Sequence, residues 1–117
     1  AFDRGEKRGV GYTLNATVLP GQGDAIYREA VAGDLATAIE RFQPEFILVS
    51  IGFDAHEDDE MSDVALTTEG YSWVMEQVVA LGERHADGKL ISILEGGYDL
   101  NRLPELAGNH VQILLNA

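Results

Sequence analysis

The chain has 117 residues, of which 45% are hydrophobic and 24% charged. These proportions are those of a globular domain, and they exclude a disordered, collagen-like or coiled-coil chain. Twenty acidic residues against eight Lys and Arg give a formal net charge of -12. A nucleic-acid backbone would be repelled, so we expect no direct nucleic-acid binding, whereas cationic partners or substrates would be attracted.

Several other classes of protein are excluded by the sequence. It holds no cysteine, which excludes disulfides, thiolate metal sites and a cysteine nucleophile. No run of about 18 apolar residues occurs, so we expect no membrane span. The first residues also lack the basic and apolar pattern of a secretory leader, and we expect a cytoplasmic protein.

The first predicted elements are a strand and a long helix. Residues 13–19 favour a short strand that ends at the Pro20 turn. Apolar residues then recur at helical spacing over residues 24–42, with Gly23-Asp24 as a candidate N-cap and Pro44 as the stop.

Two buried strands and two further helices are predicted in the rest of the chain. Residues 46–51 and 90–94 are continuous apolar runs, the pattern of parallel strands buried on both faces. A helix capped by Thr67 or Thr68 lies between them, and Pro104 begins the last helix. This alternation predicts an α/β fold with a parallel sheet.

Each predicted buried strand is followed by a loop whose side chains could bind a metal ion or take part in catalysis. Residues 52–56 read Gly-Phe-Asp-Ala-His, and residues 95–98 read Glu-Gly-Gly-Tyr. Since neighbouring parallel strands end at the same edge of a sheet, Asp54 and Tyr98 could face one cavity.

Each candidate residue has both a functional and a structural interpretation. Asp54 either binds a metal ion or caps its own turn. His56 is either its chelating partner or a solvated or supporting side chain. Tyr98 either donates a hydrogen bond to an oxyanion or packs its ring over the sheet edge. The acidic residues 57–60 are either a cation or amine site or simply a solvated loop.

Taken together, the segments resemble the C-terminal portion of the histone deacetylase and acetylpolyamine amidohydrolase family, of the bacterial or class II type. The resemblance rests most on Gly-Phe-Asp-Ala-His followed by Glu-Gly-Gly-Tyr. The matching stretches, in the family's order and spacing, are residues 15–24, 47–56, 66–71 and 92–100.

The resemblance implies a fold and an activity. The fold would be the three-layer arginase/deacetylase-like α/β fold, here a partial parallel sheet flanked by helices, with residues 1–117 as the C-terminal part of a catalytic domain. The activity would be zinc-dependent hydrolysis of the N-acetyl amides of an acetylated lysine peptide or an acetylpolyamine.

The resemblance also implies roles for individual residues. Asp54 matches a zinc ligand, and Tyr98 matches the catalytic tyrosine that stabilises the oxyanion. Met61 matches a wall of the substrate tunnel, where Gly96 and Gly97 contribute backbone. His56 and Asp59 belong to the motif without being ligands.

Two departures from the family pattern bear on activity. The family usually has proline at the positions of Thr17, Leu19 and Glu60. The family's other zinc ligands and its histidine pair belong to an N-terminal half with no counterpart here. We therefore expect one of three protein ligands for zinc and no deacetylase activity from this chain alone.

Two alternatives remain at this point. The chain could be a non-catalytic half-domain that forms a homo-oligomer through an exposed sheet edge. It could also be an acidic module that binds cations or amines through residues 54–60.

Overall fold

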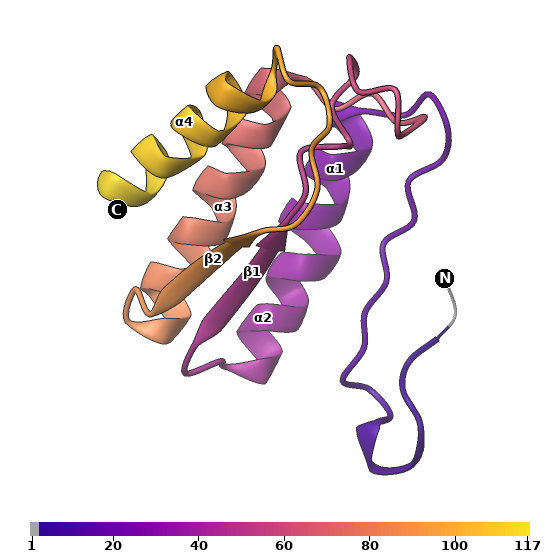
Figure 1. The fold of residues 1–117 in the computed structure, drawn as a ribbon. Helices are drawn as coiled ribbons and strands as arrows, with labels where there is room; N and C mark the ends of the chain where they lie inside the picture. The colour runs from indigo at the N-terminus through magenta and orange to yellow at the C-terminus, as the bar shows by residue number, and fades with distance from the viewer. Residues whose placement is uncertain (1–2) are drawn as a thin grey trace.

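The computed structural model describes residues 3–117 and contains a two-stranded parallel sheet with helices packed against it (Figure 1). β1 and β2 pair in register, with Ile47 opposite Leu90 and Ile51 opposite Leu94. The predicted α/β class is confirmed. In chain order the elements are the 3₁₀ turn η1 (Lys7–Gly9), α1 (Asp24–Ala30), the π-helical turn η2 (Val31–Leu35), α2 (Ala36–Phe42), β1 (Ile47–Ile51), α3 (Thr68–Ala86), β2 (Leu90–Leu94) and α4 (Leu103–Leu115).

The helix predicted over residues 24–42 is confirmed, with one local irregularity. α1, η2 and α2 follow one another without a break, and the π-helical turn lies at their centre. Gln43 ends the helix in the left-handed conformation, with φ of 54°, just before the buried Pro44. A proline disfavours helical geometry in the residue before it, which accounts for this stop.

Of the predicted N-cap pair, Gly23 takes the cap position of α1, and the Asp24 side chain contacts the start of α3 instead. The N-cap of α1 is Gly23, which has no side chain to offer, and Asp24 is the first helical residue. Its carboxylate instead accepts hydrogen bonds from the Thr67 backbone N–H at 2.8 Å and from the Thr67 hydroxyl at 2.6 Å. Thr67 in turn accepts from the N–H of Gly70 at 3.0 Å, as expected for the N-cap of α3. Asp24 thereby joins the starts of α1 and α3.

The strand predicted over residues 13–19 is wrong, because this segment has no regular secondary structure. Its side chains are almost all exposed, and in the described part of the chain only β1 and β2 form a sheet. A β-favouring sequence needs a partner strand and a surface to pack on, and this segment has neither.

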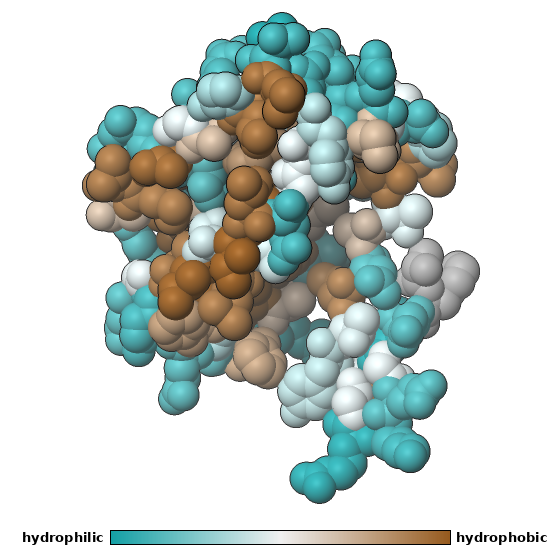
Figure 2. All heavy atoms as spheres, viewed as in Figure 1, coloured by the Kyte–Doolittle hydropathy of each residue, from teal (hydrophilic) through white to brown (hydrophobic). Residues whose placement is uncertain are grey.

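Burial of β1 and β2 on both faces is also wrong for this chain. Ile47 and Val49 face the helices, and the Ser92 hydroxyl on the same face contacts His110 of α4 at 2.7 Å. The opposite face is open, and Figure 2 shows hydrophobic residues gathered over the strands. Leu48, Ile91 and Ile93 are 69%, 50% and 48% exposed on that face.

An apolar groove of about 550 Å³ runs beside β1. Tyr12 and Leu14 of the N-terminal segment form one wall, Leu35 and Ile39 of the helices form another, and Leu48 belongs to the strand. Together the open face and this groove leave much of the sheet's apolar surface accessible to solvent.

The hydrophobic core lies at the carboxyl end of the strands. It consists of Phe53, Leu66, Tyr71 and Leu106, contributed by three separate parts of the chain. This hydrophobic core therefore lies directly under the loops that follow β1 and β2. In residues 3–117, no helix has the length and apolar character needed to cross a membrane.

Candidate functional site

Two loops lie side by side beyond the strands, and we refer to residues 52–61 as the first loop and residues 95–102 as the second loop. Backbone pairing continues past the ends of the strands. The N–H of Glu95 donates to the carbonyl of Ile51 at 2.9 Å, and the N–H of Phe53 donates to the carbonyl of Gly96 at 2.8 Å. The structure thus brings the two loops together at one edge of the sheet, as the sequence predicted.

The Asp54 carboxylate lies against glycines from both loops. A β-carbon built on Gly52 would come within 2.6 Å of Asp54 Oδ1, and one on Gly96 within 3.0 Å of its Cγ. Any larger residue at these positions would displace the carboxylate. In the described part of the chain Asp54 accepts no hydrogen bond, so its oxygens do not cap a turn and are available to a ligand.

Tyr71 holds the backbone on either side of Asp54. Its hydroxyl donates to the carbonyl of Gly52 at 2.8 Å and accepts from the N–H of Ala55 at 3.0 Å. Burial raises the pKa of Tyr71 well above its usual range, so the hydroxyl keeps the proton that this clamp requires. The sequence indicated Tyr71 only as a part of a family motif and gave no sign of this contact.

His56 is a buried support rather than a free ligand. Only 2% of its surface is exposed, and its ring stacks on Tyr71 with a 10° angle between planes. Nδ1 accepts from the N–H of Asp58 at 3.1 Å, so the proton is assigned to Nε2, which donates to the Thr68 hydroxyl at 3.0 Å. With both nitrogens engaged, this geometry does not support a chelating Asp54–His56 pair.

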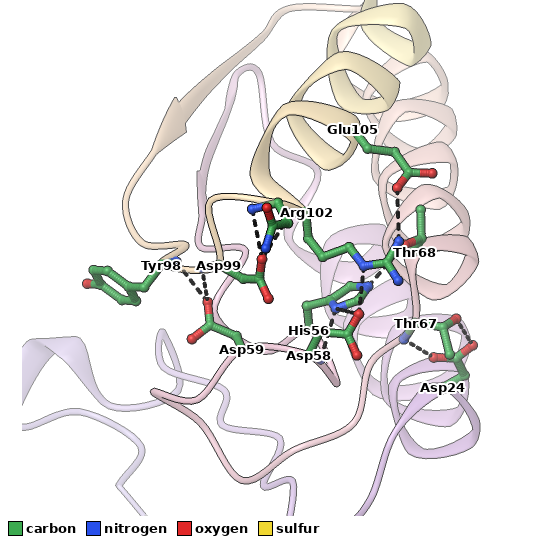
Figure 3. Close-up of polar contacts among 11 residues, drawn as sticks. Asp24, His56, Asp58, Asp59, Thr67, Thr68, Tyr98, Asp99, Arg102 and Glu105 are labelled. Atoms are coloured by element: carbon green, nitrogen blue, oxygen red, sulfur yellow. Dashed lines mark hydrogen bonds and ion pairs between the residues drawn. The ribbon is translucent and has the colours of Figure 1, made fainter.

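Tyr98 and Met61 line a hollow of about 340 Å³ between the two loops. Tyr98 is 57% exposed and Met61 is 69% exposed, and in Figure 3 the Tyr98 ring points away from the polar cluster behind it. Asp54 is not among the residues that line this hollow, so the structure groups Tyr98 with Met61 and groups Asp54 with Gly96.

Asp59 connects the two loops through its buried carboxylate, which is 4% exposed. Oδ2 accepts from the N–H groups of Tyr98 at 2.7 Å and Asp99 at 3.1 Å, while Oδ1 accepts from the N–H of Met61 at 2.9 Å (Figure 3). Burial acts to raise the pKa of Asp59, but these three N–H donors outweigh it and hold the pKa below its usual value. An Asp two residues before Met61 could have indicated the local turn, but not the contact with the second loop.

Comparisons with known proteins identify the family of this chain. Residues 1–114 match the model of the histone deacetylase domain. The chain belongs to the histone deacetylase family. A probable deacetylase of Archaeoglobus fulgidus is 40% identical over 82% of the chain, and a histone deacetylase-like amidohydrolase of Pseudomonas aeruginosa is 38% identical over 89%.

The fold of this deacetylase-family chain also matches solved structures. An acetylpolyamine aminohydrolase from Burkholderia pseudomallei superposes with a TM-score of 0.83 at 32% identity, covering 95% of this chain and 31% of that one. The chain spans 27% of the length of both the Archaeoglobus and the Pseudomonas relative. The arginase/deacetylase-like fold is thereby confirmed.

The histone deacetylase family is generally zinc-dependent. Residues 3–117 contain no group of three His, Asp or Glu side chains placed to hold an ion. A catalytic zinc site takes three protein ligands and one open position, so the described residues alone do not provide that set of ligands.

The acidic residues 57–60 are partly engaged within the chain. Asp59 is held by backbone N–H groups, and Asp58 accepts from Arg102 Nε at 2.6 Å. Only Glu57 and Glu60 remain as exposed carboxylates without such a contact in the described residues. Two of the four carboxylates are thus engaged in contacts within the chain, and two remain exposed.

Proposed function

We propose that this chain is the C-terminal part of the catalytic domain of a zinc-dependent deacetylase that hydrolyses the N-acetyl amides of acetylated lysine peptides or acetylpolyamines. The observation that carries the proposal is the hydrogen-bonded meeting of the two loops, which places Asp54 against Gly96 and places Tyr98 beside Met61. Family membership and the names of the relatives support it. The formal charge of -12 would also attract cationic substrates.

The proposed roles depend on what each side chain can do. Asp54 would act as one zinc ligand, because its carboxylate is uncapped and fits in space that Gly52 and Gly96 leave open. The exposed Tyr98 hydroxyl would donate a hydrogen bond to the oxyanion that forms when the amide carbonyl is attacked. Met61 would contact the acyl-lysine chain, and the backbone of Gly96 and Gly97 would line its path.

We also propose that these 117 residues are inactive by themselves, because Asp54 is a single carboxylate and the described residues add no further ligand group. Zinc titration calorimetry should show weak binding to the 117-residue chain. In the longest natural chain that contains these residues, binding should be one-to-one and should be lost on Asp54→Asn, together with hydrolysis of an acetyl-lysine peptide.

The control is Asp63→Asn, which changes an exposed carboxylate outside the site. It should preserve both zinc binding and hydrolysis. Retention of both by the Asp54→Asn protein would contradict the proposal, as would tight zinc binding by the 117-residue chain that survives Asp54→Asn.

A second candidate function is self-association, favoured by the open sheet face. Leu48 and Ile91 are exposed neighbours across the sheet, and no described strand pairs with the outer edge of β1. Unpaired strand edges are templates for association. Sedimentation equilibrium should then show a concentration-dependent oligomer that Leu48→Lys dissociates, and a monomer at every concentration would exclude this function.

A further inference from the structure

The second loop has little attachment of its own. Its residues include no buried side chain, and Tyr98 projects into solvent from a backbone preceded by Gly97, whose φ is 134°. Glycine is conformationally permissive, so Gly97 itself adds little rigidity to this backbone. On its C-terminal side the loop is held by Asp99, which accepts from the N–H groups of Asn101 and Arg102. Contacts with the first loop add to this in setting the position of the Tyr98 backbone.

Asp59 supplies the direct side-chain contact to this backbone. One carboxylate oxygen takes the N–H groups of Tyr98 and Asp99, and the other takes the N–H of Met61. The same carboxylate thus fixes the two residues that line opposite parts of the hollow. Such hydrogen bonds to an ionised acceptor are short and about twice as strong as those between neutral groups.

We propose that Asp59 is a positioning residue for amide hydrolysis, which holds the Tyr98 backbone at the distance from the first loop that lets the Tyr98 hydroxyl reach the oxyanion. This inference rests on the proposed function, because it requires Tyr98 to act in the reaction. In this proposal Asp59 acts through Tyr98, because both of its carboxylate oxygens are used by backbone N–H donors.

The hydrogen bonds of Asp59 predict that an amide cannot replace its carboxylate. All three partners of Asp59 are N–H donors, and each of its two oxygens is used. An asparagine has one oxygen and one NH₂ group in place of the two carboxylate oxygens. Its NH₂ group would therefore face a backbone N–H, and two donors cannot form a hydrogen bond with each other. Either the Tyr98 side or the Met61 side would then move.

The test is a double-mutant cycle in the longest natural chain that contains these residues. The four proteins are the parent, Asp59→Asn, Tyr98→Phe and the double variant, assayed for kcat and KM on an acetyl-lysine peptide. Loss of an oxyanion donor costs on the order of 10²–10³ in kcat, and a displacement of about 1 Å costs roughly 10².

We expect Asp59→Asn to lower kcat by roughly 10-fold to 10²-fold with a smaller change in KM, since the oxyanion forms only in the transition state. In the Tyr98→Phe background the same change should have little further effect, because the hydroxyl that Asp59 positions is already gone. Glu83→Gln, which changes an exposed carboxylate on α3 outside both loops, should match the parent.

Other results would overturn the inference in distinguishable ways. Equal losses from Asp59→Asn with and without the Tyr98 hydroxyl would show that Asp59 acts independently of Tyr98, while the proposed function stands. An unchanged kcat in Tyr98→Phe would contradict the proposed role of Tyr98 and the inference with it. If Asp59→Asn does not fold, Asp59→Glu keeps the charge and both oxygens but shifts them by one methylene, and it should show the same dependence on Tyr98.

Discussion

The two loops beyond the strands are held in different ways. The first loop contributes three buried residues, Phe53, His56 and Asp59, which are 3%, 2% and 4% exposed. The second loop contributes none, and it is attached through the backbone of Glu95 and Gly96, through the N–H groups of Tyr98 and Asp99, and through the surface ion pair of Arg102 with Asp58. The candidate metal ligand therefore lies on an anchored loop, and the candidate catalytic tyrosine lies on a loop that depends on the first.

This dependence has a consequence for mutation. Changes that loosen the first loop should also disturb the second, whereas changes confined to the second loop should leave the first in place. The free energy of unfolding of single variants would measure this asymmetry.

Phe53→Ala should have the largest effect, about 3–5 kcal/mol of lost stability, because it removes a buried ring at the base of the first loop. Phe53 packs on Tyr71 with ring centroids 5.2 Å apart and also supports Gly97 of the second loop. Urea denaturation would measure the change. Leu100→Ala, at a position 78% exposed in the second loop, should stay within about 0.5 kcal/mol of the parent.

Tyr71→Phe should cost about 1–3 kcal/mol, because it leaves the Gly52 carbonyl and the Ala55 N–H without their partner. The ring remains, so the loss reports the hydroxyl alone. Tyr12→Phe, at a residue 74% exposed, is the matched control and should be close to neutral. Equal effects from the two substitutions would show that the clamp beside Asp54 does not stabilise the first loop.

Lower pH should destabilise the protein through His110, which packs edge-on against Phe53 and has a buried Nδ1 without a partner in the described structure. Burial lowers the pKa of His110, so the unfolded chain takes up the proton more readily than the folded one. Stability should be unaffected by this group above the unfolded pKa of about 6.5 and should fall below it.

The measurement is urea denaturation at about pH 7.5 and at about pH 5.5, on either side of the unfolded pKa. His110→Gln should reduce the difference between the two, and His85→Gln, near the end of α3, should not. A difference unchanged by His110→Gln would assign the pH dependence to other groups.

Asp58→Asn should have the smallest effect, since it removes an exposed ion pair with Arg102 that links the two loops at the surface. Any loss should disappear at high salt, where such pairs are screened. A large loss that persists at high salt would mean that the second loop relies on this pair more than on Asp59.

Local sequence patterns predicted much of the fold. Pro44 marked the end of the first helical stretch, Thr67 the start of α3, and Pro104 the first turn of α4. The strand prediction for residues 13–19 was wrong, because strand formation depends on a partner strand that local composition does not reveal.

The candidate site was predictable only in part. The loop motifs indicated Asp54 and Tyr98, and parallel pairing of the strands explains why their loops meet. The contacts of Asp59 with Tyr98 and of Tyr71 with Gly52 join residues 39 and 19 positions apart, and such pairs arise from tertiary packing alone. The sequence also predicted that Asp54 and Tyr98 could face one cavity, whereas Asp54 is not among the residues that line the hollow beside Tyr98.

The π-helical turn at residues 31–35 affects how tolerant the protein is to changes in length. A π-turn holds about one residue more than an α-turn, so the long helix accommodates an extra residue while α1 and α2 keep their positions. Deleting the exposed Gly33 would let this turn close to α-helix, and Ile39 would still face the groove beside β1. α3 is a regular α-helix and contains no extra residue of this kind. A deletion inside it would rotate one half of the helix relative to the other by about 100°.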